Sequence, residues 1–310
     1  MTAGDNAKCS ICNSAGIRII DYLNYKGNGF FRNMAYALPV PIANFLSKIS
    51  HTFARLYYPV RVNKKYFSRK IGYCSVCHSG CVTPEFTEEE LDEYYGEFYW
   101  KNRGHHEDIH DISSIHIPLA YNINLSRERI GWIQQNGVSM SPQSFVIDFG
   151  AGDCAAAYTF KTDFGIANVS IVDKSTRSKD IAKKLGVNFY SLLKDIPSSA
   201  DILFSAHSIE HVHDLKNSLY QIFNKIKDGG YIFFETPNIA DLEIFKSMAH
   251  TPHTYMLSTD SFVQLACTFS YEIVAVQTSG PRWKLSHPKM KSEGRTDLRV
   301  LLRKLGPPKI

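Results

Sequence analysis

The sequence predicts an α/β protein in which a mostly parallel sheet follows a smaller cysteine-rich module. From Phe145 onward, short apolar runs alternate with helical stretches at regular spacing, which is typical of parallel strands joined by crossover helices. The first hundred residues lack that alternation and contain two Cys-x-x-Cys pairs. With 310 residues, of which 44% are apolar and 21% charged, the chain is long enough for one main domain and a smaller one.

The apolar runs give the expected elements of the second part. Strands are expected at Phe145–Phe149, Val169–Asp173, Val187–Tyr190, Asp201–Ala206, Tyr231–Glu235, Tyr271–Gln277 and Leu298–Arg303. Helices are expected at Ala155–Lys161, Ser178–Leu185, Leu215–Ile226 and Asp260–Thr268. A Pro- and Lys-rich stretch at 281–295 separates the last two strands, so we expect them to form an antiparallel pair. We divide the chain into a cysteine-pair module (1–100), a helical connector (101–144) and an α/β domain (145–305).

Nothing in the sequence predicts a membrane-spanning or secreted protein. No stretch at its beginning resembles a signal peptide, and no apolar run approaches the roughly 20 residues that a membrane span needs. Five of the seven cysteines cluster in the first part, which favours metal ligation in a reducing compartment over a disulfide framework. We therefore expect a cytoplasmic protein.

The net charge of +5 is unevenly distributed. Residues 22–84 contain no acidic residue, and the stretch 85–111 is strongly acidic. The nine basic residues of the first stretch are Lys26, Arg32, Lys48, Arg55, Arg61, Lys64, Lys65, Arg69 and Lys70. The two stretches could face each other, or the basic one could bind a phosphate-bearing small molecule, a phospholipid headgroup or RNA.

An amphipathic helix expected at 42–56 either packs on its own domain or serves as a membrane-surface helix or a substrate lid.

A glycine-containing loop follows the first strand of the α/β domain. The segment Asp148-Phe149-Gly150-Ala151-Gly152-Asp153 leads into a helix that begins with small residues, where free N–H groups can meet a ligand. The pattern also fits the dinucleotide loop of dehydrogenases, and Asp173 after the second strand suits a ribose in either case. Asp148 favours a cationic ligand such as S-adenosylmethionine, because an acid there would oppose a pyrophosphate.

Two later segments complete a family resemblance. Residues 200–212, which include Ala206-His207-Ser208-Ile209-Glu210-His211, and residues 226–238, which include Gly229-Gly230, are similar to the fourth- and fifth-strand motifs of class I methyltransferases. The resemblance implies a Rossmann-like, seven-stranded sheet whose last strand is antiparallel. It also implies S-adenosylmethionine as cofactor, with its methionine part at Asp148, Gly150, Ala151 and Gly152, its ribose at Asp173, and its methyl group beside Ala206 and His207. The segment 191–193 lacks the acid that often meets the adenine.

Histidines and an acid crowd together after the fourth strand. His207, Glu210, His211 and His213 are candidates for a base that removes a proton from the acceptor, and we name His211, His207 and Glu210 as catalytic candidates. His211 could instead close the turn as a structural residue. The His-x-x-Glu-His spacing also matches an inverted zinc-protease motif, and a divalent ion bound by His207, Glu210 and His211 is a further alternative.

The two cysteine pairs predict a structural zinc site. Cys9 and Cys12 can supply one half of a tetrahedral thiolate site, and Cys74 and Cys77 the other. Cys81 or His78 could replace one ligand. A redox pair is the alternative, although neither pair follows a strand and opens a helix, the setting that lowers a thiol pKa.

The second pair and its surroundings resemble an N-terminal module of bacterial methyltransferases, including enzymes that methylate nucleotide-linked sugars. The resemblance rests on Tyr73-Cys74-Ser75-Val76-Cys77-His78, Pro84 and the acidic run that leads to Tyr94 and Tyr95. It implies that the module helps to form the acceptor pocket, with Tyr94, Tyr95 or Tyr99 near the acceptor. Packing on a helix face is the alternative for these tyrosines. We expect a methyltransferase for a small acceptor, namely a sugar or glycosyl intermediate of surface-polysaccharide or natural-product assembly. The alternatives are an RNA methyltransferase and a non-catalytic cofactor-binding module.

Overall fold

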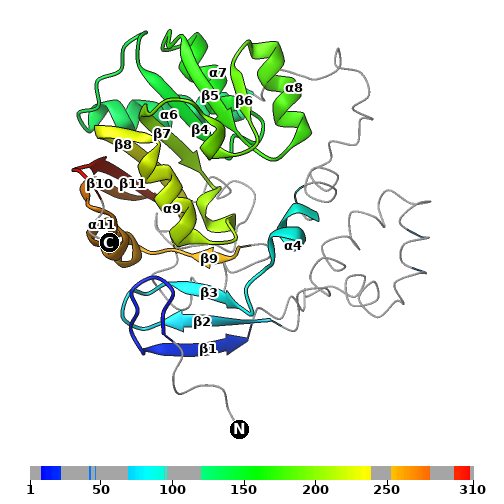
Figure 1. Ribbon diagram of the computed structural model, residues 1–310, viewed down its shortest axis with the longest axis vertical. Helices are drawn as coiled ribbons and strands as arrows, with labels where there is room; N and C mark the ends of the chain where they lie inside the picture. The colour runs from blue at the N-terminus through cyan, green and yellow to red at the C-terminus, as the bar shows by residue number, and fades with distance from the viewer. Residues whose placement is uncertain are drawn as a thin grey trace.

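The computed structural model describes residues 8–21, 42, 46, 69–93, 95, 120–238, 253–279 and 297–307. These residues form a seven-stranded mixed sheet and a four-stranded antiparallel sheet (Figure 1). The large sheet occupies the upper part of Figure 1, and the small sheet lies below it, beside the carboxyl-terminal ends of some large-sheet strands.

The large sheet has the order β10-β11-β8-β7-β4-β5-β6. Its strands are β4 (Phe145–Phe149), β5 (Asn168–Val172), β6 (Asn188–Tyr190), β7 (Ala200–Ala206), β8 (Ile226–Pro237), β10 (Tyr271–Ser279) and β11 (Asp297–Lys304). The strands from β8 to β6 are parallel, whereas β11 runs antiparallel to both of its neighbours. This topology confirms the predicted Rossmann-like fold with seven strands and an antiparallel last strand.

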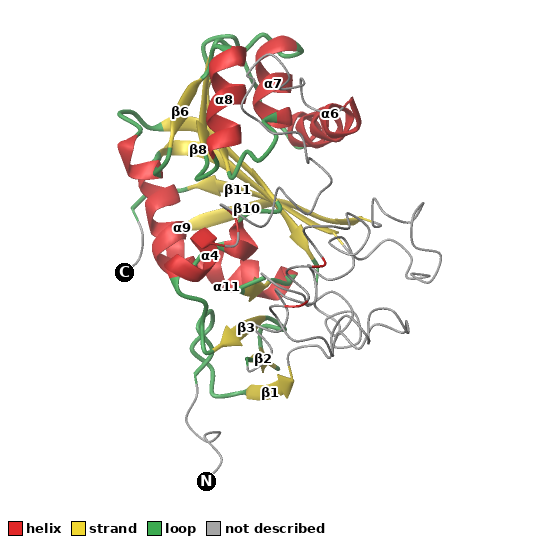
Figure 2. Ribbon diagram, turned by 90° about the vertical axis from the view of Figure 1, so that its right-hand side faces the viewer, coloured by secondary structure: helices red, strands yellow, loops and turns green. Residues whose placement is uncertain are grey.

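Helices cover both faces of this sheet (Figure 2). One apolar core packs α6 (Ala120–Gln135), α7 (Ala155–Thr162) and α8 (Thr176–Leu185) on one face. The other core contains α9 (Leu215–Asn224) and α11 (Thr259–Phe269). In the centre, Phe204 and Phe233 stack with their ring centroids 4.9 Å apart. Strands buried on both faces need continuous apolar runs, which is why the sequence locates them well.

Most predicted elements agree with the observed ones to within two residues at each end. The exception is the predicted strand 231–235, because β8 already begins at Ile226, which pairs with Ala200. The predicted helix 215–226 accordingly ends at Asn224. The register between β7 and β8 then shifts before Ile202 meets Tyr231, so a Gly-containing irregularity precedes the regular part of the strand.

The small sheet joins distant parts of the chain in the order β1-β2-β3-β9. Its strands are β1 (Ile17–Asp21), β2 (Lys70–Cys74), β3 (Gly80–Thr83) and β9 (Tyr255–Met256). After β9, the Ser258 hydroxyl caps α11 and donates a hydrogen bond of 2.6 Å to the carbonyl of Cys77. The cysteine-pair module therefore packs against the α/β domain through a strand that the α/β domain contributes.

Part of the charge segregation lies within the described residues. Arg69 donates a 2.6 Å hydrogen bond to Glu90 of α4 (Glu88–Glu93), which joins the basic and acidic stretches. Lys174 donates to Glu88 and Asp92 at 2.8 and 2.6 Å. Besides Arg69 and Lys70, the other seven basic residues of the stretch lie outside the described residues. The same holds for Tyr94, Tyr99 and all of the expected 42–56 helix except Ile42 and Leu46.

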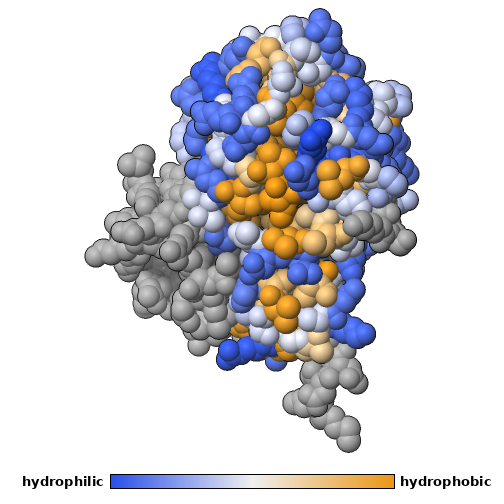
Figure 3. All heavy atoms as spheres, turned by 90° about the vertical axis from the view of Figure 1, so that its left-hand side faces the viewer, coloured by the Kyte–Doolittle hydropathy of each residue, from blue (hydrophilic) through white to orange (hydrophobic). Residues whose placement is uncertain are grey.

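Apolar side chains are also exposed at the β10 edge of the large sheet. Val274 and Val276 of β10 and Val263 of α11 are 37–40% exposed. Figure 3, which views the molecule from the left-hand side of Figure 1, shows apolar residues gathered in a band on this side. In the described part of the chain, no helix has the length and apolar character required to cross a bilayer.

Candidate active site

The glycine loop lies where the strand order reverses. From β4 the chain first adds β5 and β6 on one side, and then returns to add β7 on the other. Ligands of open α/β sheets bind at this point, outside the carboxyl ends of the strands. Gly150 and Gly152 have φ angles of 71° and 55°, and a Cβ on Gly150 would lie 2.2 Å from the Ser208 hydroxyl. Glycine is thus required at position 150 by both conformation and space.

Asp148 lies beneath this loop and is 2% exposed. Its carboxylate accepts a 3.1 Å hydrogen bond from the Ala157 N–H in the first turn of α7. Burial raises the pKa of Asp148 to about 7. The carboxylate therefore anchors the helix that follows the loop, and its charge favours a cationic ligand less strongly than the sequence suggests. The direct contact with a cofactor that the sequence predicts for Asp148 stays a prediction.

Asp173 connects the loop to the end of β5. One carboxylate oxygen accepts from the Gly152 N–H and the other from the Ser175 N–H, both at 2.8 Å. Burial raises the pKa of Asp173, although these backbone donors oppose that effect. A carboxylate has about four acceptor positions, so the partly exposed Asp173 can still accept hydrogen bonds from a ligand.

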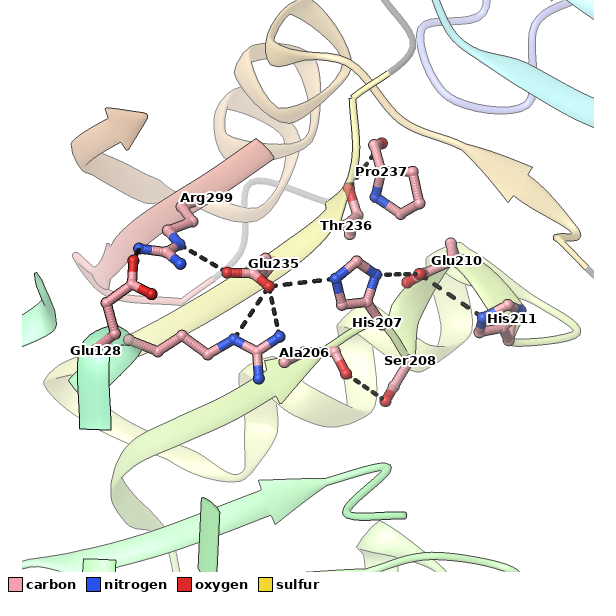
Figure 4. Close-up of polar contacts among 11 residues, drawn as sticks. Glu128, Ala206, His207, Ser208, Glu210, His211, Glu235, Thr236, Pro237 and Arg299 are labelled. Atoms are coloured by element: carbon pink, nitrogen blue, oxygen red, sulfur yellow. Dashed lines mark hydrogen bonds and ion pairs between the residues drawn. The ribbon is translucent and has the colours of Figure 1, made fainter. Parts of the chain in front are cut away.

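A buried ionic network lies at the ends of β7 and β8 (Figure 4). Glu235 of β8 is 0% exposed and accepts hydrogen bonds from Arg129 of α6 at 2.5 and 3.0 Å and from Arg299 of β11 at 2.6 Å. Burial alone would raise the pKa of Glu235, but Arg129, His207 and Arg299 hold it well below its usual range. Sequence reasoning missed this network. A charged residue within the apolar run 231–236 was its one visible signal.

His207 lies between two buried carboxylates. It follows β7 with a φ of 53°, and its ring nitrogens lie 3.5 Å from Glu210 and 3.2 Å from Glu235. Burial would lower the pKa of His207, but the two carboxylates outweigh it and raise that pKa to about 9. At neutral pH the ring is therefore protonated, so in this arrangement it cannot accept a proton from an acceptor.

Glu210 and His211 lie in the short turn η4 (Ile209–His211) and face the segment before β9. Glu210 is 1% exposed, and its carboxylate lies 3.5 Å from a ring nitrogen of His207 and 3.7 Å from one of His211. Burial would raise the pKa of Glu210, but His211 and His207 lower it. The His211 ring packs at 4.8 Å from the ring of His253 and edge-on at 5.7 Å from Tyr95. The structure thus brings together a carboxylate, two histidines and a tyrosine.

His213 has a different position from the other candidates. It is exposed, and its Nδ1 lies 2.6 Å from the Phe86 carbonyl, so it connects the α/β domain to the cysteine-pair module. Tyr255 donates a 3.2 Å hydrogen bond to the carbonyl of His213. His213 and Tyr255 therefore both have structural hydrogen-bond partners.

The four predicted zinc ligands lie together. The side chains of Cys9, Cys12, Cys74 and Cys77 have sulfur atoms within 4.8 Å of one another, and the Cys9–Cys77 and Cys12–Cys74 pairs are 3.6 Å apart. A tetrahedral zinc site with bonds of about 2.3 Å places its sulfurs about 3.8 Å apart, so the arrangement fits zinc. The possible substitutes lie elsewhere: His78 contacts Asp260 at 2.7 Å, and Cys81 lies 3.6 Å from Glu85.

Comparison with known proteins identifies the family. A family model described as "Methyltransferase domain" matches residues 121–306, which is more than half of the chain. The chain belongs to this methyltransferase family. The match covers the glycine loop, the turn at Glu210 and the antiparallel last strand, but it begins after the cysteine-pair module. No curated protein sequence matches the chain.

Solved methyltransferase structures are similar to this family member. Coclaurine N-methyltransferase is 13% identical, with 59% of this chain and 70% of that chain covered and a TM-score of 0.46. Geranyl diphosphate C-methyltransferase from Streptomyces coelicolor A3(2) is 14% identical, with 58% and 80% covered and a TM-score of 0.47. The plantazolicin methyltransferase is 15% identical, with 69% and 93% covered and a TM-score of 0.46.

Proposed function

We propose that this protein is an S-adenosylmethionine-dependent methyltransferase that acts on a small acceptor, namely a sugar or glycosyl intermediate of surface-polysaccharide or natural-product assembly. One observation carries the proposal. The accessible glycine loop, Asp173 and the His211 turn all lie at the carboxyl ends of β4, β5 and β7, where they surround the switch point of a methyltransferase sheet.

The residues of this crevice fit the cofactor. Gly150, Ala151, Gly152 and Asp173 are partly exposed, and the positive φ angles of the glycines leave the backbone open to close approach. In the proposal the loop holds the methionine part, and Asp173 accepts from the ribose hydroxyls. Ala206 and His207 lie beside the reacting methyl group. Once bound, the cofactor supplies an electrophilic methyl group on a sulfonium.

His211, Glu210 and His207 form the proposed catalytic turn. Of the three, His211 is placed to act on the acceptor, because its ring is 18% exposed and lies against Tyr95 and His253. The buried carboxylate of Glu210 orients the two histidine rings. His207, which is protonated at neutral pH, supplies positive charge and a fixed floor for the site instead of a base.

The cysteine-pair module is proposed to hold zinc and to help select the acceptor. It supplies Tyr95 to the His211 cluster and the Phe86 carbonyl to His213. The sugar class rests on the resemblance of this module to those of sugar methyltransferases. The basic stretch 22–84 within this module would hold phosphates of the acceptor, and a reducing cytoplasm suits the thiolates.

The function can be tested with labelled cofactor. We expect methylated products when pooled nucleotide-sugars and small metabolites are incubated with the protein and isotopically labelled S-adenosylmethionine, followed by mass spectrometry. Calorimetry should show binding of S-adenosylhomocysteine that Asp173→Ala weakens at least tenfold, whereas Asp195→Ala, on the turn after β6, serves as the control. Absence of both cofactor binding and product would refute the proposal.

His211→Ala provides the second test. It should lower turnover by about 100-fold, the usual minimum for a group that assists proton loss from the acceptor, and leave cofactor binding nearly intact. Unchanged turnover would move the catalytic role away from His211.

Zinc can be tested by elemental analysis. Protein purified without chelator should contain zinc that Cys9→Ser or Cys74→Ser removes, because each change deletes one thiolate of the four. Zinc-free wild-type protein would favour the redox alternative.

A further inference from the structure

A second group of metal-binding side chains lies in the proposed acceptor site. Within the described residues, one ligand atom from each of Glu210, His211 and His253 lies within 4.8 Å of the other two. Glu210 and His253 are 1% and 5% exposed, whereas His211 retains access to solvent. Two imidazoles and one carboxylate are a common donor set for divalent transition metals with open coordination positions.

The carboxylate of Glu210 gives an independent indication of a cation site. Within the described part of the chain, neither of its oxygens accepts a hydrogen bond, and its ion-pair neighbours His207 and His211 remain at 3.5 and 3.7 Å. Leaving a buried carboxylate without hydrogen-bond donors is costly, and a cation bound to Glu210 would offset that cost. The neighbouring Glu235, also buried, accepts from two arginines at hydrogen-bonding distance.

Backbone hydrogen bonds fix the two segments that carry these three residues. The Thr254 N–H donates to the Glu210 carbonyl at 2.9 Å, which ties the residue after His253 to η4. The His211 N–H donates to the Ser208 carbonyl at 3.0 Å. The site is therefore largely formed before a ligand enters, which reduces the cost of binding.

We propose that Glu210, His211 and His253 bind one divalent transition-metal ion, distinct from the proposed zinc at the four cysteines. His207 is not a ligand, because its two ring nitrogens face Glu210 and Glu235. The sequence suggested His207, Glu210 and His211 as possible ion ligands. In the structure His253, which is distant in sequence but close in space, takes the place of His207.

The ion gives the His211 turn a chemical role, and this part rests on the proposed function. An acceptor hydroxyl that occupies an open position of the ion becomes more acidic, as water does on a catalytic metal, and it releases its proton to solvent. The site then selects acceptors that present an oxygen to the ion. His211 acts on such an acceptor through the metal instead of removing the proton itself.

Manganese is a suitable probe because it prefers carboxylate oxygen to thiolate, whereas thiolate sites favour zinc. We would titrate the full-length protein with Mn²⁺ and follow the free ion by electron paramagnetic resonance, and measure zinc per chain by elemental analysis. The expected result is one Mn²⁺ per chain, or a second zinc per chain when zinc is supplied. Glu210→Gln and His253→Ala should each weaken this binding at least tenfold.

Matched control variants show whether weaker Mn²⁺ binding results from the loss of a ligand or from a disturbed fold. Glu88→Gln changes an exposed glutamate, and His213→Gln changes a nearby histidine that faces Phe86; both should bind Mn²⁺ as the wild type does. Circular dichroism of every variant should show a folded chain. If His253→Ala does not fold, His253→Gln replaces it.

The outcomes distinguish this proposal from the methyltransferase function. If the wild type takes up neither Mn²⁺ nor a second zinc, or if the Glu210 and His253 variants bind as tightly as the wild type, the metal site is refuted even where methylated product is detected. If the metal binds as expected but S-adenosylhomocysteine does not, the site stands and the methyltransferase function fails. An unchanged product yield in the presence of chelator would refute the metal's role with the acceptor.

Discussion

Two glutamates buried on either side of His207 have opposite environments. Glu235 is 0% exposed and accepts hydrogen bonds from Arg129 and Arg299. Glu210 is 1% exposed, and within the described residues its carboxylate oxygens accept no hydrogen bond. Burial costs both carboxylates their hydration, but only Glu235 is fully compensated by donors from the chain itself.

The difference indicates that Glu235 has a structural role and Glu210 a role in ligand binding within the same site. The network of Glu235 joins α6, β8 and β11, and so fixes the floor beside His207. Glu210 instead faces two histidines next to the accessible end of β7. A buried charge that accepts close hydrogen bonds stabilises a framework, whereas one that accepts none within the described residues is available to a ligand.

The largest expected effect is that of removing the compensated charge. Glu235→Gln leaves Arg129 and Arg299 buried beside a neutral amide, so we expect a loss of about 3 kcal/mol in the free energy of unfolding. Denaturant unfolding measures it. A loss below about 1 kcal/mol would show that the network contributes little, and Arg299→Met would test the same network if Glu235→Gln does not fold.

Glu210→Gln should cost less. Its carboxylate pairs with His207 and His211 only at 3.5 and 3.7 Å, longer than the arginine contacts of Glu235, so the change should lower the free energy of unfolding by about 1 to 2 kcal/mol. The same denaturant experiment measures it. Losses of equal size for the two glutamates would break the comparison.

The ionisation of His207 should give stability a pH dependence. Its pKa rises from 6.5 to about 9 in the folded protein, because the two carboxylates outweigh burial. A raised folded-state pKa gives a stabilisation that is complete below pH 6.5 and is lost as the pH rises to about 9. Unfolding free energies measured from pH 6 to 10 should fall in this window, and His207→Gln should flatten the slope. An identical slope in that variant would assign the titration to another group.

The smallest effect is expected for an exposed ionic contact. Lys174 is 47% exposed and pairs with Glu88 and Asp92, which are at least half exposed, so solvent screens these pairs. Lys174→Ala should change the free energy of unfolding by no more than about 0.5 kcal/mol, again by denaturant unfolding. If Lys174→Ala lowered the free energy of unfolding as much as Glu235→Gln, the contact between Lys174 and α4 would matter more for stability than the buried charges.

The sequence predicted the strands of the large sheet well because most are buried apolar runs of regular spacing. It predicted the glycine loop because Gly150 must adopt a positive φ beside Ser208. It misplaced the end of the helix at 215–226, since a short apolar segment at Ile226 suits either a helix or a strand. The Cys pairs were recognised as one site from their spacing alone, and the structure brings their sulfurs together.

By itself, then, the sequence determined the methyltransferase sheet, the loop at its switch point and the four-cysteine cluster, because local patterns specify each of them. Only the tertiary structure decided which charges are compensated. Arg129 and Arg299 reach Glu235 across 106 and 64 residues, and β9 brings His253 to Glu210. Such partners are set by strand order and by the return of the chain to the small sheet, and no local pattern in the sequence encodes either.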